Sequence, residues 1–126
     1  MIKVLITDDH RLVRDGFKRL LEDEPDIKVV GEANSGKEAL AFVRAQKVDI
    51  VILDISMPVE SGLDVLPKLK QIAPELRVLI VSMHTEQHVV ALALETGANG
   101  YLSKESAAEN LVEAIQRACG RSTIQE

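Results

Sequence analysis

The chain has 126 residues, 46% of them hydrophobic, and a formal net charge of −5. This length predicts one domain with a continuous core. The negative charge argues against nucleic-acid binding by this chain, because neutralising phosphates needs clustered Lys and Arg. The single cysteine, Cys119, excludes an internal disulfide framework and is typical of a reducing compartment. With neither a membrane-spanning apolar run nor a secretory signal pattern, we expect a cytoplasmic protein without membrane contacts.

In chain order, apolar runs that predict strands alternate with stretches of helical periodicity. The runs are rich in Ile, Val and Leu, as in parallel sheets covered on both faces, and lie near 2–7, 27–32, 49–53, 77–82 and 98–102. The stretches between them repeat apolar residues every three or four positions, as in Val13, Phe17 and Leu20. Five uninterrupted strand–helix units predict a doubly wound α/β fold with right-handed crossovers.

Local signals place two helix starts. Ser35 precedes the second helical stretch, and Glu38 three residues later predicts a capping box. Pro67 fits the third helix only in its first turn, so this helix is expected to begin near Leu63 or Asp64. Residues 54–62 are therefore expected to form a loop of roughly eight residues that shapes a pocket wall.

Polar residues stand at, or just past, the end of four predicted strands: Asp8, Asp9, Asp54, Ser82 and Lys104. The carboxyl ends of parallel strands share one edge of the sheet, where ligands bind at the topological switch point. We therefore expect these side chains to meet in one pocket. Three carboxylates, one hydroxyl and one ammonium can hold a divalent cation and a phosphoryl group.

The chemistry of these residues favours a magnesium site with a carboxylate nucleophile. Asp8 and Asp9 repel each other when ionised, and a cation such as Mg²⁺ removes that penalty. Asp54 can attack a phosphoryl group, and Lys104 can neutralise the developing charge. Two plainer interpretations stay open: the acid pair as a solvated turn, and Asp54 with Lys104 as a structural ion pair.

The motifs TDDH, LDISMP, VSMH and YLSK, in this order and spacing, resemble the receiver domains of two-component response regulators. The resemblance runs from Lys3 to about Cys119, and VVGEANSGKEAL and ETGANGYLSK are most similar to the NarL/FixJ subgroup with a LuxR-type output. It implies a CheY-like, flavodoxin-like (βα)5 fold with strand order 2-1-3-4-5. The receiver domain would cover 1–119, and 120–126 would be a polar tail or the start of a linker.

The resemblance also implies a role for each motif residue. Asp54 would be the phosphoacceptor, and Asp9, Asp54 and the Ser56 carbonyl would bind Mg²⁺ directly, with Asp8 acting through water. Lys104 would bridge to the phosphoryl group. Ser82 and Tyr101 would form the conformational switch. The residues expected to tune the lifetime of the phosphoryl group are Ser56, Met57 and His84.

The chain departs from the family pattern after Lys104. Glu105 stands where many receivers have proline preceded by a cis bond. A cis bond before glutamate costs about 3–4 kcal/mol, so either a trans bond or a strained cis bond is expected here.

The implied function is that of a switch, not an enzyme, apart from catalysis of its own phosphoryl transfer and dephosphorylation. A histidine kinase or a small acyl phosphate would phosphorylate Asp54. The face made by the fourth helix, fifth strand and fifth helix would then change and control an output. Transcription through a LuxR-type DNA-binding domain outside these residues is expected, with a homodimer through this or another helical face. The apolar run 89–94, VVALAL, favours a contact surface there.

Other interpretations remain. The chain could be a stand-alone receiver acting through protein contacts. A Mg²⁺-dependent phosphatase with Asp54 as nucleophile would usually have a second aspartate two residues later, where this chain has Ser56. A flavodoxin-like cofactor binder would not need Lys104. Residues 31–37, GEANSGK, resemble a P-loop, but Glu38 replaces the required hydroxyl. His84 and His88 could pair on a metal, although surface histidines are favoured, and His10 is interpreted as a loop residue.

Overall fold

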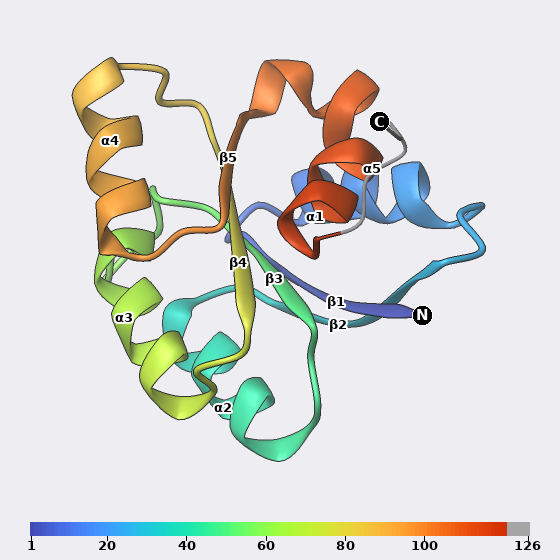
Figure 1. Ribbon diagram of the computed structural model, residues 1–126, viewed down its shortest axis with the longest axis horizontal. Coiled ribbons are helices and arrows are strands. Elements are labelled where there is room, and N and C mark those ends of the chain that lie inside the picture. The colour runs from blue at the N-terminus through green and yellow to red at the C-terminus, as the bar shows by residue number, and fades with distance from the viewer. Residues whose placement is uncertain (121–126) are drawn as a thin grey trace.

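Five apolar runs form one parallel sheet. The computed structural model describes residues 1–120. Its strands are β1 (Ile2–Thr7), β2 (Ile27–Ala33), β3 (Ile50–Leu53), β4 (Arg77–Ser82) and β5 (Gly100–Ser103), in the order β2-β1-β3-β4-β5 (Figure 1). All four pairings are parallel. The predicted flavodoxin-like topology is confirmed, and strand bounds differ from those predicted by at most two residues.

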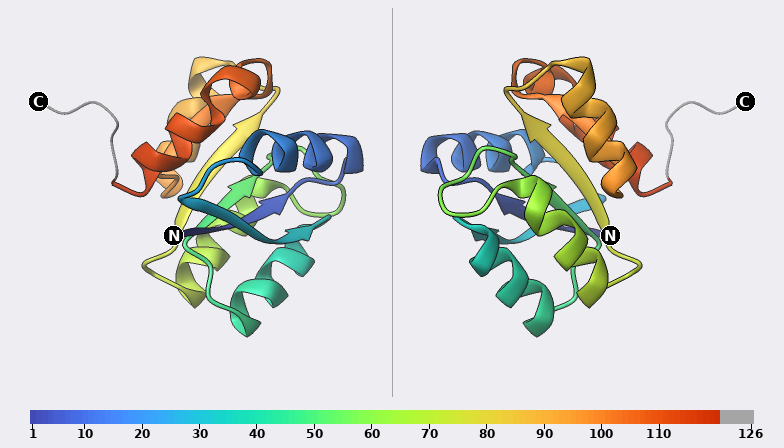
Figure 2. Two further views of the ribbon diagram at one scale, coloured as in Figure 1. Left: turned by 90° about the vertical axis from the view of Figure 1, so that its right-hand side faces the viewer. Right: turned by 90° about the vertical axis from the view of Figure 1, so that its left-hand side faces the viewer.

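Two groups of helices cover the sheet. One face packs against α1 (Arg11–Leu21) and α5 (Ala107–Ala118), and the other against α2 (Gly36–Ala45), α3 (Gly62–Ile72) and α4 (Gln87–Thr96) (Figures 1 and 2). Alternate residues of each strand face opposite layers. Leu5 and Val51 belong to the core beneath α2, α3 and α4, whereas Ile6 and Ile52 belong to the core beneath α1 and α5.

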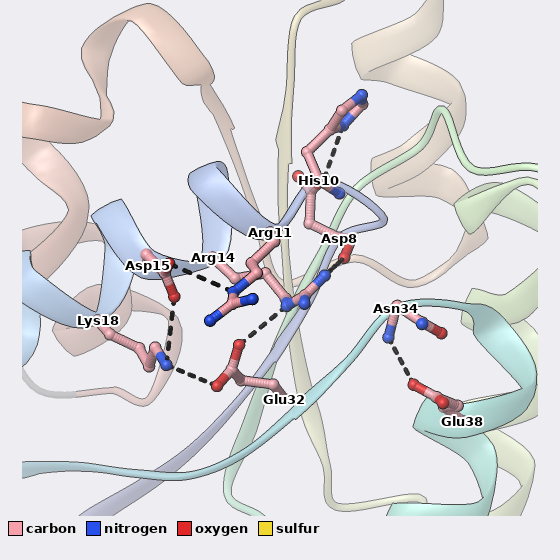
Figure 3. Close-up of polar contacts among 9 residues, drawn as sticks. All are labelled: Asp8, His10, Arg11, Arg14, Asp15, Lys18, Glu32, Asn34 and Glu38. Carbon is pink, nitrogen blue, oxygen red and sulfur yellow. Dashed lines mark hydrogen bonds and ion pairs between the residues drawn. The ribbon is translucent and has the colours of Figure 1, made fainter.

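The cap of α2 follows the predicted motif in part. Ser35 Oγ accepts a hydrogen bond from the Glu38 amide at 3.2 Å, as a capping box requires. The Glu38 carboxylate, however, accepts from the Asn34 amide at 2.8 Å and not from the Ser35 amide (Figure 3). The bond from the Glu38 side chain to the preceding loop is therefore made to residue 34, one residue before the N-cap residue that a capping box would use.

The start of α3 corrects one prediction. The helix begins at Gly62, because the side chain of Ser61 caps it by accepting from the Leu63 amide at 3.1 Å. Pro67 is therefore the sixth helical residue and lies in the second turn, not the first. It is exposed, and its missing N–H leaves the Leu63 carbonyl without the usual intrahelical donor. The loop after β3 spans residues 54–61, which agrees with the expected length.

Some expectations concern the ends of the chain. Of the predicted polar tail, only Gly120 lies within the described residues, so the boundary at 119 stays a prediction. Within residues 1–120, no helix combines the length and apolar character needed to cross a membrane.

Candidate functional site

Side chains from three separate strand ends meet at the carboxyl edge of the sheet. Asp8 follows β1, Asp54 follows β3, and Lys104 follows β5. The Lys104 ammonium lies 2.9 Å from Asp8 Oδ2 and 3.3 Å from Asp54 Oδ2. The side chains of Asp8 and Asp54 are only 1% and 2% exposed. The convergence expected from the sequence is therefore present for these three residues.

The sheet order explains how these residues reach one another. β1 and β3 are neighbours, and the Asp54 amide donates to the Thr7 carbonyl at 3.1 Å, which places the two acidic strand ends side by side. β5 is separated from β3 by β4, so a residue at its end needs a long side chain to reach the acids. Lys104 meets this need from a single 3₁₀ turn, Lys104–Ser106, which is capped by Ser103 Oγ. Within residues 1–120 every peptide bond is trans, so the bond before Glu105 is trans.

The charges in this cluster do not balance. Burial raises the pKa of Asp54, and the neighbouring Asp8 carboxylate raises it further, while Lys104 and the Ser56 amide oppose the increase. Burial alone would lower the pKa of Lys104, but Asp8 and Asp54 together raise it above its ordinary value. One ammonium thus faces several carboxylates, and the site retains excess negative charge.

The acidic residues fit a divalent cation. Among the described residues, the buried oxygens Asp8 Oδ2, Asp9 Oδ1 and Asp54 Oδ2 have only ion-pair contacts, with Lys104 or His10, and accept no further hydrogen bond. Potential ligand atoms of Asp8, Asp9, His10 and Asp54 all lie within 4.8 Å of one another. Carboxylate oxygens are the ligands that Mg²⁺ prefers. Asp8, Asp9 and Asp54 could therefore hold this ion.

The side chain of His10 is part of this cluster, which the sequence did not predict. Its Nδ1 atom lies 3.1 Å from Asp8 Oδ1 and 3.2 Å from Asp9 Oδ1. Adjacency in TDDH was the only available signal, and adjacency does not fix the direction of a side chain. The other two histidines, His84 and His88, do not belong to a group of three or more potential metal ligands within residues 1–120.

The predicted switch residues are linked through the backbone of His84. Ser82 is fully buried at the end of β4, and its Oγ accepts from the His84 amide at 3.0 Å. The Tyr101 hydroxyl donates to the His84 carbonyl at 2.8 Å, and burial raises the pKa of this hydroxyl. The ring of His84 also contacts a predicted tuning residue, because its Nε2 lies 2.9 Å from Ser56 Oγ.

Other sequence candidates lie apart from the cluster. Met57 is buried in the core beneath α2, α3 and α4. The P-loop-like segment does not form a phosphate loop, because residues 31–33 belong to β2 and Ser35 caps α2. A cavity of about 540 Å³ includes Asp49, Arg77 and Cys119 but none of the converging acids. A second, of about 450 Å³, borders Asp9 and Val59.

Val59, in the loop after Asp54, adopts a backbone angle that disfavours its residue type. Its φ is +72° and its side chain is fully exposed, so no side-chain packing compensates for the left-handed conformation, although the Glu60 amide donates to the Pro58 carbonyl across it at 2.8 Å. We expect Val59→Gly to raise the free energy of unfolding by roughly 0.5–1 kcal/mol, after allowance for glycine's greater freedom when unfolded. Val59→Ala keeps the Cβ atom and should give no such gain. Urea denaturation of both variants tests this, and equal stabilities would contradict it.

Comparison with known proteins identifies the family. The model of the response regulator receiver domain matches residues 4–116. Response regulator UvrY of Escherichia coli O6:H1 is 44% identical over 116 residues, 92% of this chain and 53% of UvrY. A LuxR-family response regulator from Aurantimonas has a TM-score of 0.89 at 36% identity, covering 95% of this chain and 86% of that one. The receiver domain of response regulator NarL from Mycobacterium tuberculosis has a TM-score of 0.87 at 37% identity, covering 95% and 98%.

The chain belongs to the receiver domains of two-component response regulators, within the NarL/LuxR-type subgroup. Members of this family are signalling proteins that interact with histidine kinases, and they are not classical enzymes. The chain spans about half the length of the curated relatives it matches.

Proposed function

We propose that this domain is a phosphorylation switch in which Asp54 accepts a phosphoryl group from a histidine kinase or a small acyl phosphate. The observation that carries this proposal is the environment of the Asp54 carboxylate. It is buried, its Oδ2 lies 3.3 Å from the Lys104 ammonium, and the acidic residue Asp8 is close enough to raise its pKa. A carboxylate that served only as the partner of Lys104 would not require a second buried acid beside it.

The proposed reaction is a direct displacement at phosphorus. An Asp54 oxygen forms the new P–O bond while the bond to the donor's imidazole nitrogen or acyl oxygen breaks, and the donor leaves with that electron pair. Lys104 neutralises charge on the phosphoryl oxygens. Bound Mg²⁺ would supply further charge neutralisation, held by Asp9, Asp54 and the Ser56 carbonyl, with Asp8 acting through water. Dephosphorylation by water would return the domain to its starting state.

The output is proposed to run through the face formed by α4, β5 and α5. A phosphoryl group on Asp54 would attract Ser82 and Lys104, and the His84 backbone connects Ser82 to Tyr101. These shifts would bias a two-state surface that supports homodimer formation, here or on another helical face. Exposed Leu92 and Leu94 on α4 support a contact role.

We also propose that the regulated process is transcription. DegU of Brevibacillus brevis, 39% identical over 115 residues, is a transcriptional regulatory protein. DNA binding would belong to a LuxR-type domain outside these residues. Ser56, Met57 and His84 would tune the phosphoryl lifetime, and the cytoplasmic location stays a prediction.

The proposal is tested by incubating the protein with acetyl phosphate and Mg²⁺ and measuring its intact mass. We expect one phosphoryl group to be added to the wild-type chain and none to Asp54→Asn. The control Asp23→Asn removes an exposed carboxylate outside the site and should be phosphorylated normally. Phosphorylation of Asp54→Asn would contradict the assignment, and so would steady turnover of phosphomonoesters, which would indicate a phosphatase.

A further inference from the structure

The turn that carries Asp8 and Asp9 lacks the usual means of holding a helix start. It connects β1 to α1, and His10 occupies the N-cap position of α1 without a side-chain cap. The turn also brings like charges together, because both carboxylates lie near Asp54. Repulsion between these acids favours opening of the turn when no cation is bound. Within the turn, the His10 amide donates to Asp8 Oδ1 at 2.9 Å, and a second interaction from α1 adds to this bond.

Arg14 provides such an interaction from the first turns of α1. Its Nη1 donates to the Asp8 carbonyl at 2.7 Å (Figure 3). The Asp8 amide donates to the Ala33 carbonyl at 3.1 Å, so both backbone polar groups of Asp8 are bound. The Arg14 side chain is only 15% exposed, so water has little access to compete for its hydrogen bonds.

Arg14 is itself held by a residue on the neighbouring strand. Its Nε donates to Glu32 Oε1 at 2.9 Å, and Glu32 lies in β2 beside Ile6 of β1. The other carboxylate oxygen of Glu32 accepts from Lys18 at 2.6 Å. Figure 3 shows Glu32 bonded to Arg14 and Lys18 of α1. Both bonds lower the pKa of Glu32, and the bond from Lys18 has the larger effect. The Glu32 carboxylate therefore stays ionised.

We propose that Arg14, oriented by Glu32, is a positioning residue that holds the turn of Asp8 and Asp9 in the geometry that binds the divalent cation. Glu32 thereby influences the cation affinity of a site that it does not touch. Residues outside the ligand shell that orient metal ligands commonly change affinity by about 10- to 100-fold. The inference rests on the proposed function, because that function requires the cation.

The structure provides a matched control for this proposal. Lys18 and Arg14 both extend from α1 and both bind Glu32, but only Arg14 also binds the turn. An effect of α1 packing, or of charge near Glu32, would appear on removal of either residue. An effect on the turn would appear only when Arg14 or its support is removed.

The test is titration of the full chain with Mg²⁺ by isothermal calorimetry, with urea stability measured in parallel without the ion. We expect Arg14→Ala to weaken Mg²⁺ binding by about 10-fold and Lys18→Ala to change it by less than about twofold. Glu32→Ala should weaken binding in the same direction. Glu32→Gln keeps an acceptor for Arg14 and should restore part of the affinity. Arg14→Ala combined with Glu32→Ala should be no weaker than Arg14→Ala alone, because Glu32 acts through Arg14.

Specific results would overturn the proposal. Unchanged Mg²⁺ affinity in Arg14→Ala, even with reduced urea stability, would make Arg14 a purely structural residue. Equal losses in Arg14→Ala and Lys18→Ala would do the same. If Arg14→Ala does not fold, Glu32→Ala and Glu32→Gln decide the question by the same titration. Failure of the wild-type chain to bind Mg²⁺ would instead contradict the magnesium part of the proposed function.

Discussion

Replacement of Lys104 by methionine is expected to lower the free energy of unfolding by about 3 kcal/mol, because it leaves buried carboxylates without their cation. The Lys104 side chain is 12% exposed and contacts both Asp8 and Asp54. Phosphorylation by acetyl phosphate should slow by about 100-fold or more, since a preorganised charge at the phosphoryl oxygens is lost. Urea denaturation and the rate of mass gain measure the two effects separately.

The stability loss in Lys104→Met should depend on pH in a defined direction. Burial already raises the pKa of Asp54, and removal of Lys104 raises it further. An acid whose pKa is higher in the folded state destabilises the fold as pH rises from its unfolded to its folded pKa. The deficit relative to wild type should therefore be larger at about pH 8 than at about pH 5.

A matched lysine variant serves as the control for Lys104→Met. Lys68 also pairs with a carboxylate, that of Glu60, but its side chain is 53% exposed. Lys68→Met should cost about 0.5 kcal/mol or less, because exposed ion pairs contribute little. Equal losses in the two variants, or a Lys104→Met deficit that does not change with pH, would contradict the electrostatic explanation.

Replacement of Gly62 by alanine is expected to disturb Asp54, the proposed phosphoacceptor. A Cβ atom at Gly62 would lie 2.1 Å from the Asp54 carbonyl oxygen and 3.0 Å from Ile55 Cα. These are backbone atoms, so the loop after β3 must shift to admit the methyl group. We expect a loss of about 2–3 kcal/mol in unfolding free energy. Displacement of Asp54, the proposed nucleophile, by about 1 Å should also slow phosphorylation by about 100-fold.

Gly16 provides the comparison for Gly62→Ala. It lies in α1 and is exposed, and a Cβ atom added there would meet no neighbouring side chain or loop within 4 Å. Gly16→Ala should therefore stabilise the protein by about 0.5–1 kcal/mol through helix propensity and leave phosphorylation unchanged. Wild-type phosphorylation kinetics in Gly62→Ala would show that the loop accommodates the methyl group without moving Asp54.

The sheet and the convergence of the acids with Lys104 could be predicted because they depend on patterns along the chain. Continuous apolar runs identify strands, and parallel strands bring their carboxyl ends to one edge. The fifth strand starts two residues later than expected, at Gly100. We attribute this to Asn99. Its side-chain oxygen accepts a hydrogen bond from the Val78 amide at 2.9 Å, so Asn99 binds β4 through its side chain and precedes β5.

Other features depend on interactions that no local pattern encodes. The contact of Arg14 with Glu32 requires the register of β1 and β2, which shifts between Val4 and Leu5. The left-handed backbone of Val59 carries no sequence signal, because valine disfavours that conformation. Pro67 lies in the second turn of α3, although the chemistry of proline favours the first turn. The cap at Ser61 determines where the helix begins, and no rule based on proline alone predicts that cap.

Arg14 binds the main-chain oxygen of Asp8 and not its carboxylate, so the bond that anchors the turn does not use the side chain of Asp8. A peptide carbonyl is present whatever side chain the residue bears. The side chains of Asp8 and Asp9, which are proposed to hold the ion, can therefore be exchanged without deleting this backbone acceptor. The ion preference of the site could thus be changed one side chain at a time while the bond from Arg14 to the turn is retained.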